Sequence, residues 1–361
     1  MGRACLAWLI FAAFGHGFLA AQEANSGLDL RATLSGQFAV SNVYEEAPRS
    51  GEPVGAGFRS VFYPTWKLSK NWDITGAWQL YSRPYFFQDF QDSGEGVNGN
   101  ILQASLNYSR VSDRGSVMIR AGQLSTAFGS FLLRYDDADN ALVDLPIQYG
   151  YYDSPVSTLS VAGAQLDATR GKWDGRVQFA NSSPSNPRSL FGHDQYGNWT
   201  GGGGHTIRQG FRVGVSGYRG PYLNRGNIYY PVSAAGPGTL PASALGVDTN
   251  WARGHWVVLG ELQKFVMPLT TAPNIRQLAG YGEFKRELNP RWYFSGRFGA
   301  SSANAYGNVE CYEAAAGFRP NRLQLIKIEY EMERYSVGPL HSEDTLAIQY
   351  VTTLHTAFAK N

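Results

Sequence analysis

The chain has 361 residues, of which 17% are charged, and its formal net charge is +2. Near-neutrality argues against a general nucleic-acid-binding surface. Glycine contributes 42 residues and aromatic residues 14%, whereas the charged fraction is below the quarter that is usual in soluble domains. Beyond the N-terminus no apolar run approaches the 18 residues of a transmembrane helix, which excludes helical spans.

The first 21 residues have the pattern of a secretory signal peptide. Arg3 gives a positive start, Leu6 to Phe14 form a short apolar core, and Leu19-Ala20-Ala21 is a cleavage site. A transmembrane anchor is the alternative, but the apolar core is too short for one. We therefore expect an exported protein with a short N-terminal lead at 22–27.

Cysteine use fits export without disulfides. Cys5 lies in the predicted signal peptide, and Cys311 then has no partner for an internal disulfide. A chain of this size needs another source of stability, and hydrogen bonding around a closed sheet is one such source.

Period-two alternation, the signature of β-strands, begins in the segment 62–80. Phe62, Pro64, Trp66 and Leu68 share one face, and after a turn at 69–71 the alternation resumes from Trp72 to Leu80. Tryptophan on both sides of the turn is typical of a membrane interface.

Similar hairpins follow along the chain, each with a short turn. In the next one, Leu102, Ala104, Leu106 and Tyr108 are expected on the outer face. The short turns are predicted at 112–115, 170–172, 252–254, 288–290 and 319–322. Longer connections rich in Gly, Pro, Asn and Ser alternate with them, near 84–99, 127–156, 182–205, 219–243, 265–274, 302–308 and 335–342.

The strand count depends on one weak region. The run Gly201–Gly204 is interpreted as a tight turn that follows a weak strand near 190–199, which brings the total to 16 strands. Fourteen or eighteen strands are the alternatives. A bacterial single-chain barrel has an even number.

The clearest alternation is at the C-terminal end. Between Ile326 and Glu333 four apolar residues alternate with four charged ones, and the last strand is expected at 344–358. A soluble β-sandwich or propeller would turn such apolar faces inward. Together with the signal peptide, the repeated pattern instead predicts an all-β transmembrane, antiparallel up-and-down β-barrel over residues 28–358, with short periplasmic turns and long extracellular loops.

Arginines are the first candidate functional residues, because arginine outnumbers lysine 24 to 7. Arginine stays charged and holds anions through a planar fork, so a column of arginines in the lumen would favour anions. The alternative is that they only solvate the wall of a general polar pore and pair with carboxylates such as Asp73, Asp174 and Glu261. The predicted pore-lining residues are Arg31, Arg59, Arg83, Arg120, Arg176, Arg212 and Arg297.

The loop at 127–156 is the second candidate, because it is long and has no clean period. Folded into the lumen, it would narrow the pore, and its carboxylates would set a transverse field against wall arginines. The alternative is an outward surface loop. Its charged candidates are Arg134, Asp136, Asp137, Asp139 and Asp144.

Tryptophans beside the short turns are the third candidate group, and we interpret them as a membrane-interface belt. A sugar-stacking track at Tyr81 and Tyr293 is a weaker alternative. Histidine spacing shows no metal site, no serine–histidine–aspartate set indicates a catalytic centre, and no cofactor is implied. The belt residues are Trp66, Trp72, Trp173, Trp251, Trp256 and Trp292.

Several short motifs, in order, resemble the phosphate-selective porin O and P family over roughly residues 115–358. They are Gly122-Gln123 with Phe128-Gly129, Gly163–Asp167, Gly171–Asp174, Ser216–Tyr222, Gly246–Asp248 with Gly260-Glu261, and Arg319–Arg322. The resemblance implies a 16-stranded outer-membrane channel that forms a homotrimer.

The sequence therefore predicts a porin in the outer membrane of a Gram-negative-type bacterium. Its partners would be membrane lipid and either small hydrophilic solutes or inorganic anions. The solutes or anions would cross the membrane through the barrel by passive diffusion. A binding or structural barrel and an outer-membrane hydrolase are the alternative functions.

Overall fold

The computed structural model describes residues 27–42, 54–83, 85, 96–149, 159–181, 197–221, 241–269, 273–305, 307–337 and 342–359. The predicted signal peptide, nearly all of the lead at 22–27 and the end of the loop at 127–156 lie outside these residues. No helix among the described residues is long and apolar enough to cross a membrane.

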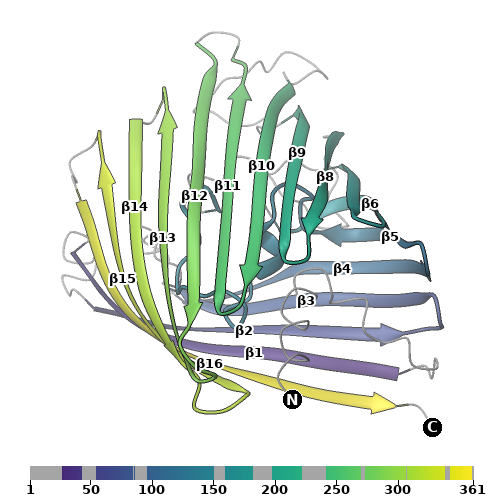
Figure 1. The fold of residues 1–361 in the computed structure, drawn as a ribbon, viewed down its shortest axis with the longest axis horizontal. Helices are drawn as coiled ribbons and strands as arrows, with labels where there is room; N and C mark the ends of the chain where they lie inside the picture. The colour runs from purple at the N-terminus through teal and green to yellow at the C-terminus, as the bar shows by residue number, and fades with distance from the viewer. Residues whose placement is uncertain are drawn as a thin grey trace.

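Sixteen strands form one closed antiparallel barrel, in which each strand pairs with its neighbours in sequence and β1 pairs with β16 (Figure 1). The prediction of an all-β, 16-stranded antiparallel barrel is thus confirmed. The strands are β1 (Gly27–Ser41), β2 (Val54–Lys67), β3 (Trp72–Arg83), β4 (Gly96–Ser112), β5 (Gly115–Leu124), β6 (Val161–Arg170), β7 (Trp173–Ala180), β8 (Asn198–Arg208), β9 (Phe211–Pro221), β10 (Pro241–Arg253), β11 (Trp256–Met267), β12 (Ile275–Glu287), β13 (Trp292–Ala303), β14 (Gly307–Phe318), β15 (Gln324–Tyr335) and β16 (Ser342–Ala359).

Closure of the barrel rests on the pairing of the two terminal strands. Their register runs from Gly27 opposite Ala359 to Ser41 opposite Thr345, so the contact extends along the whole of β1. Because β1 also pairs with β2, no strand edge is left open.

The apolar face of the strands points outward. Trp173, Phe179, Ile328 and Tyr330 are 64%, 43%, 49% and 48% exposed. The charged Lys327 and Glu329, which alternate with Ile328 and Tyr330 along β15, are fully buried. A soluble sandwich or propeller would bury these apolar residues, so the structure excludes that alternative. The outer surface has the polarity of a surface that contacts lipid.

The prediction of a turn at Gly201–Gly204 is wrong. These glycines lie inside β8, and the chain turns later, at Gln209-Gly210, before β9. Four glycines resemble a turn in sequence, but here they allow close packing: a Cβ on Gly204 would overlap the guanidinium of Arg212. The long connection expected at 182–205 is correspondingly shorter.

The expected outer face of β4 is also partly wrong. Ala77 of β3 pairs with Gln103 and Trp78 pairs with Ile101, which leaves Leu102 opposite no residue. This β-bulge shifts the alternation by one position. Leu102 is therefore buried inside the barrel, and Ile101 is exposed on the outside in its place.

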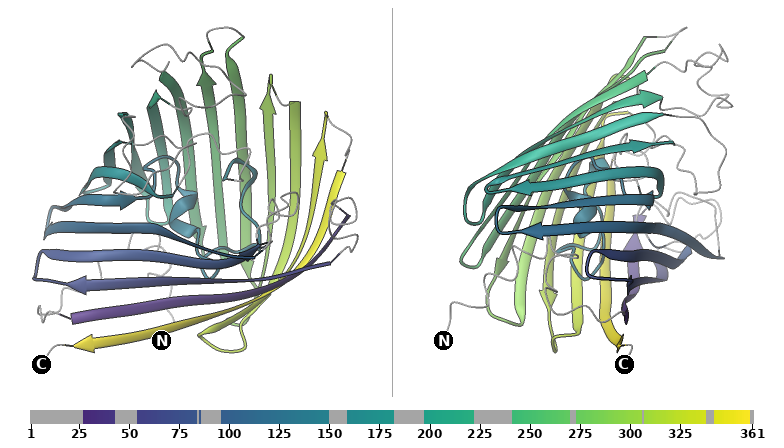
Figure 2. Two further views of the ribbon diagram at one scale, coloured as in Figure 1. Left: turned by 180° about the vertical axis from the view of Figure 1, so that it is seen from behind. Right: turned by 90° about the vertical axis from the view of Figure 1, so that its right-hand side faces the viewer.

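The connection between β5 and β6 enters the barrel. It contains two short 3-10 helices, η2 (Phe131–Arg134) and η3 (Ile147–Tyr149), and it crosses the interior beside the inner faces of the strands (Figure 2). We call residues 125–149 the internal loop, and its contacts with the wall define the candidate site.

Candidate functional site

The internal loop is held by inward-facing side chains from opposite parts of the wall. Glu261 of β11 accepts hydrogen bonds from the backbone N–H and the hydroxyl of Ser130, at 2.8 and 2.6 Å. Arg297 of β13 donates to the carbonyl of Asp144, at 2.8 Å. Arg176 of β7 donates to the carbonyl of Gly129. These contacts satisfy backbone groups that would otherwise be buried without partners.

Lys327 and Glu329 of β15 clamp the centre of the internal loop. Lys327 Nζ donates to three loop carbonyls, those of Asp137, Asn140 and Leu142, at 3.0, 3.3 and 2.7 Å. Glu329 accepts the backbone N–H groups of residues 143 and 144, at 2.5 and 3.1 Å. Both side chains are fully buried, so the clamp is shielded from water.

Loop aspartates meet arginines of β1 and β2. Asp137 pairs with Arg59 at 2.8 Å, and Asp136 and Asp139 pair with Arg31 at 3.3 and 3.4 Å. Asp136 also accepts a hydrogen bond from the Thr33 hydroxyl, at 2.9 Å. The loop carboxylates therefore lie against wall arginines as close ion pairs. A transverse field across the pore stays a prediction.

Burial and charge act in opposite directions on Asp136. Burial by itself would raise the pKa of this carboxyl group, but the charge of Arg31 and hydrogen bonds outweigh burial and lower the pKa below its ordinary 3.8. The folded state thus favours ionised Asp136 more than the unfolded chain does.

Two further predicted arginines pair with carboxylates on neighbouring strands. Arg120 pairs with Asp167 at 2.7 Å, and Arg212 bridges Asp174 and Asp248, each at 2.6 Å. The alternative prediction, in which wall arginines pair with carboxylates, therefore describes part of the geometry. Asp174, one of the carboxylates expected to pair with an arginine, does so.

Arg297 and Arg134 converge on one carboxylate. Glu283 of β12 lies 3.3 Å from Arg134 and 3.5 Å from Arg297, and Arg297 also pairs with Glu313 of β14.

Arg83 is the last residue of β3, and its side chain lies outside the described part of the structure.

A group of carboxylates lies where the internal loop meets β14 and β15. Asp144, Glu313, Glu329 and Glu331 are all buried there. Burial, together with the negative charges of Glu313 and Glu329, raises the pKa of the Asp144 carboxyl group well above its ordinary value.

Sequence reasoning missed the roles of Lys327, Glu329, Glu331, Glu283 and Glu313. The strict alternation at 326–333 already placed the charges of β15 on one face. Nothing local in the sequence indicated that this face would bind a loop almost two hundred positions earlier, since Lys327 and Asp137 are 190 residues apart.

The six predicted belt tryptophans lie at the end of the barrel that carries the short turns. Trp66 is the penultimate residue of β2, just before the β2–β3 turn, Trp173 follows the β6–β7 turn and Trp292 follows the β12–β13 turn. Ring partners support several of them, for example Trp72 with Tyr108 at a centroid distance of 5.1 Å. All but Trp251 are among the exposed large hydrophobic residues. Their role at a membrane interface stays a prediction.

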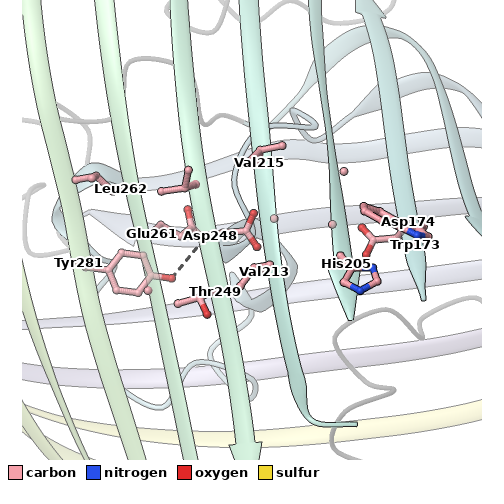
Figure 3. Close-up of a pocket in the computed structure, with 15 residues that line it drawn as sticks. Trp173, Asp174, His205, Val213, Val215, Asp248, Thr249, Glu261, Leu262 and Tyr281 are labelled. Atoms are coloured by element: carbon pink, nitrogen blue, oxygen red, sulfur yellow. Dashed lines mark hydrogen bonds between the residues drawn. The ribbon is translucent and has the colours of Figure 1, made fainter. Parts of the chain in front are cut away.

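A hollow of about 820 Å³ lies over β7 to β12, where glycines thin the wall (Figure 3). Its lining combines outward side chains, such as Val213 and Leu262, with inward ones, such as Asp248 and Glu261. Trp173 and His205 lie at one side of it, with ring centroids 4.2 Å apart. At the other side the Tyr281 hydroxyl points toward Glu261, at 3.4 Å.

Comparison of the chain with models of protein families found no match, and comparison with curated proteins found none either. Solved structures do match. An anion-selective porin from Comamonas acidovorans is 9% identical, with a TM-score of 0.65, and the alignment covers 91% of this chain and 100% of that one.

Two further structures are similar over the same extent. The outer-membrane channel DcaP of Acinetobacter baumannii is 9% identical, with a TM-score of 0.62 and coverage of 93% and 100%. The trimer form of OmpT of Vibrio cholerae is 10% identical, with a TM-score of 0.57 and coverage of 92% and 100%. At such low identity these likenesses establish the porin fold of this chain, and no family match supports the narrower phosphate-selective resemblance.

The buried clamp yields a prediction about the internal loop. Lys327→Met keeps the length of the side chain but leaves three loop carbonyls without their charged donor, at a cost of about 2 kcal/mol or more. We expect amide hydrogen exchange in residues 139–149 to accelerate by roughly tenfold or more. Lys264→Met, at an exposed outward position of β11, is the matched control. Equal exchange in the two variants would contradict the clamp.

The lowered pKa of Asp136 yields a prediction about pH. A carboxylate with a depressed folded-state pKa stabilises the protein above its unfolded pKa and loses that effect as pH falls through the folded value. Asp136→Asn should therefore reduce the free energy of unfolding by about 1 to 3 kcal/mol at pH 7. The difference from wild type should begin to shrink near pH 3.8, the ordinary pKa of this carboxyl group, and vanish only below its lower folded-state pKa. Denaturant titrations of vesicle-refolded protein at several pH values measure this, with Asp113→Asn in an exposed turn as control.

Proposed function

We propose that the protein is a porin of the outer membrane of a Gram-negative-type bacterium, through which small hydrophilic solutes diffuse passively. The observation that carries the proposal is the combination of an apolar outer face with a charged inner face around a closed 16-stranded barrel. Such a wall meets lipid on one side and water on the other. The porins and outer-membrane channels with the same fold support the proposal.

The internal loop would be the constriction of this channel. It is tied to β1, β2, β7, β11, β13 and β15 by ion pairs and hydrogen bonds, so it narrows the interior at a fixed place. In this proposal the short turns face the periplasm, the long loops face the outside, and the tryptophans beside the turns lie at the inner interface. A homotrimer remains the expected assembly, and the trimer form of the Vibrio OmpT supports it.

Conductance is the direct test of the channel proposal. We expect the purified protein, refolded without other membrane proteins, to insert into planar lipid bilayers and to conduct ions in discrete steps. A mock-refolded sample without the protein is the control. Folded protein that inserts but shows no ion-conducting steps would instead support a binding or structural barrel.

Anion preference is the finer part of the proposal. The side chains of Arg31 and Arg120 each keep 28% of their surface exposed inside the barrel, whereas those of Arg59 and Arg297 are fully buried. Solutes in the lumen can therefore reach Arg31 and Arg120, and they can also reach the partner carboxylates Asp139 and Asp167, which are 39% and 27% exposed. The carboxylates of β14 and β15 are buried beneath the internal loop and are shielded from such solutes.

Phosphate selectivity is not part of the proposal. The internal loop contains no lysine, and its arginine, Arg134, already lies against Glu283 and the Tyr281 hydroxyl. Dedicated phosphate binding needs cationic donors that face the solute.

Reversal potentials in a salt gradient test the role of the accessible arginines. Arg31→Gln and Arg120→Gln each remove one exposed positive charge, so each should shift the permeability ratio of wild type toward cations, and the double variant should shift it further. Arg276→Gln, on the outer face of β12, is the matched control and should leave the ratio unchanged. An unchanged ratio in the double variant would remove these arginines from the solute path.

A further inference from the structure

The carboxylates at the junction of the internal loop with β14 and β15 form a compact group. Asp144, Glu313 and Glu331 each place one carboxylate oxygen within 4.8 Å of those of the other two. They come from three different segments of the chain, and all three residues are buried. Like charges held this close repel one another strongly in a water-poor environment.

The hydrogen bonds of this group leave one oxygen unmatched. Glu313 pairs with Arg297, and the neighbouring Glu329 accepts two backbone N–H groups. Glu331 is only 3% exposed, and its Oε2 atom is buried without a hydrogen-bond partner among the described residues. A buried carboxylate oxygen that lacks a donor needs a proton or a cation.

The nearest cationic side chains are already committed elsewhere. Arg297 is bonded to Glu313, Glu283 and the carbonyl of Asp144, and Lys327 donates to three loop carbonyls. Carboxylates therefore outnumber cations at this junction, so the group must balance its charge with protons shared between carboxyl groups or with a cation from solution.

We propose that Asp144, Glu313 and Glu331 bind a Ca²⁺ ion that joins the internal loop to the wall of the barrel. Oxygens that lie 2.3–2.6 Å from one Ca²⁺ can be at most about 5.2 Å apart, and one oxygen from each of these three carboxylates lies within 4.8 Å of the other two, which satisfies that limit. A carboxylate has enough lone pairs for Glu313 to keep Arg297 while it contacts a cation. The irregular, anionic ligand set suits Ca²⁺ better than the strict octahedron of Mg²⁺.

A second group shares Glu331 with this site. The Cys311 thiol, Glu331 and Glu333 also lie within 4.8 Å of one another. Thiolates select softer metals, and Tyr335 donates a hydrogen bond to Glu333. The group of Asp144, Glu313 and Glu331 offers only hard carboxylate oxygens, which Ca²⁺ prefers, and is therefore the proposed Ca²⁺ site.

Calorimetric titration of Ca²⁺ into the whole refolded protein tests the site independently of conductance. The protein is refolded into an uncharged detergent, which supplies no lipid phosphate, and is freed of metal with a chelator. We expect saturable binding at one site per chain at pH 7. Glu331→Gln, which removes the charge at nearly constant shape, should weaken binding at least tenfold.

The matched control is Asp167→Asn, which removes an inward carboxylate of β6 that already pairs with Arg120. It should bind Ca²⁺ as wild type does. If Glu331→Gln fails to refold, as judged by heat-modifiable gel mobility, Asp144→Asn in the internal loop takes its place. Absence of saturable binding in wild type, or equal affinity in wild type and a folded site variant, overturns the proposal.

Hydrogen exchange gives a second measurement on the same samples. A Ca²⁺ ion that ties Asp144 to two strands should slow amide exchange in residues 142–149 of wild type but not of Glu331→Gln. Ca²⁺ that slows exchange equally in both would mean that it binds elsewhere, which also overturns the proposal.

Discussion

Closure of the sheet between β1 and β16 is the constraint on which the rest of this structure depends. Once the terminal strands pair along their length, every strand has two partners and the two faces of the sheet are separated completely. Alternation then assigns each side chain to one side. Apolar residues cover the outside, and arginines, carboxylates and amides are gathered in one enclosed space.

That enclosed space determines how the internal loop folds. Polar backbone groups of a buried segment need partners, and the inner faces of the strands supply them. Arg297 and Lys327 donate to loop carbonyls, while Glu261 and Glu329 accept loop N–H groups. The wall therefore acts as a set of hydrogen-bonding partners for the internal loop, which explains why so many charges on it are buried.

Charge inside the barrel is distributed unevenly. Arg31, Arg59 and Arg120 lie on early strands and are paired with aspartates, whereas the acidic group of β14 and β15 lies beneath the internal loop. Arg31 and Arg120, which are partly exposed in the lumen, and the buried carboxylates of β14 and β15 can therefore have separate roles: the two arginines act on solutes, and the carboxylates hold the internal loop. The proposed Ca²⁺ ion would balance the second group without changing the first.

The sequence by itself determined the strands, their inward and outward faces and most turns, because alternation is a local property that adjacent side chains carry. It also placed Arg31, Arg59 and Arg297 inside. Local signals were wrong in two places where the packing of the backbone determines the structure. The glycines of β8 lie in a strand and allow close contact with Arg212, and a β-bulge in β4 turns the side chain of Leu102 from the outer to the inner face. Only the tertiary structure decided which charges meet, because partners such as Arg31 and Asp136 lie 105 residues apart and are brought together by closure of the barrel.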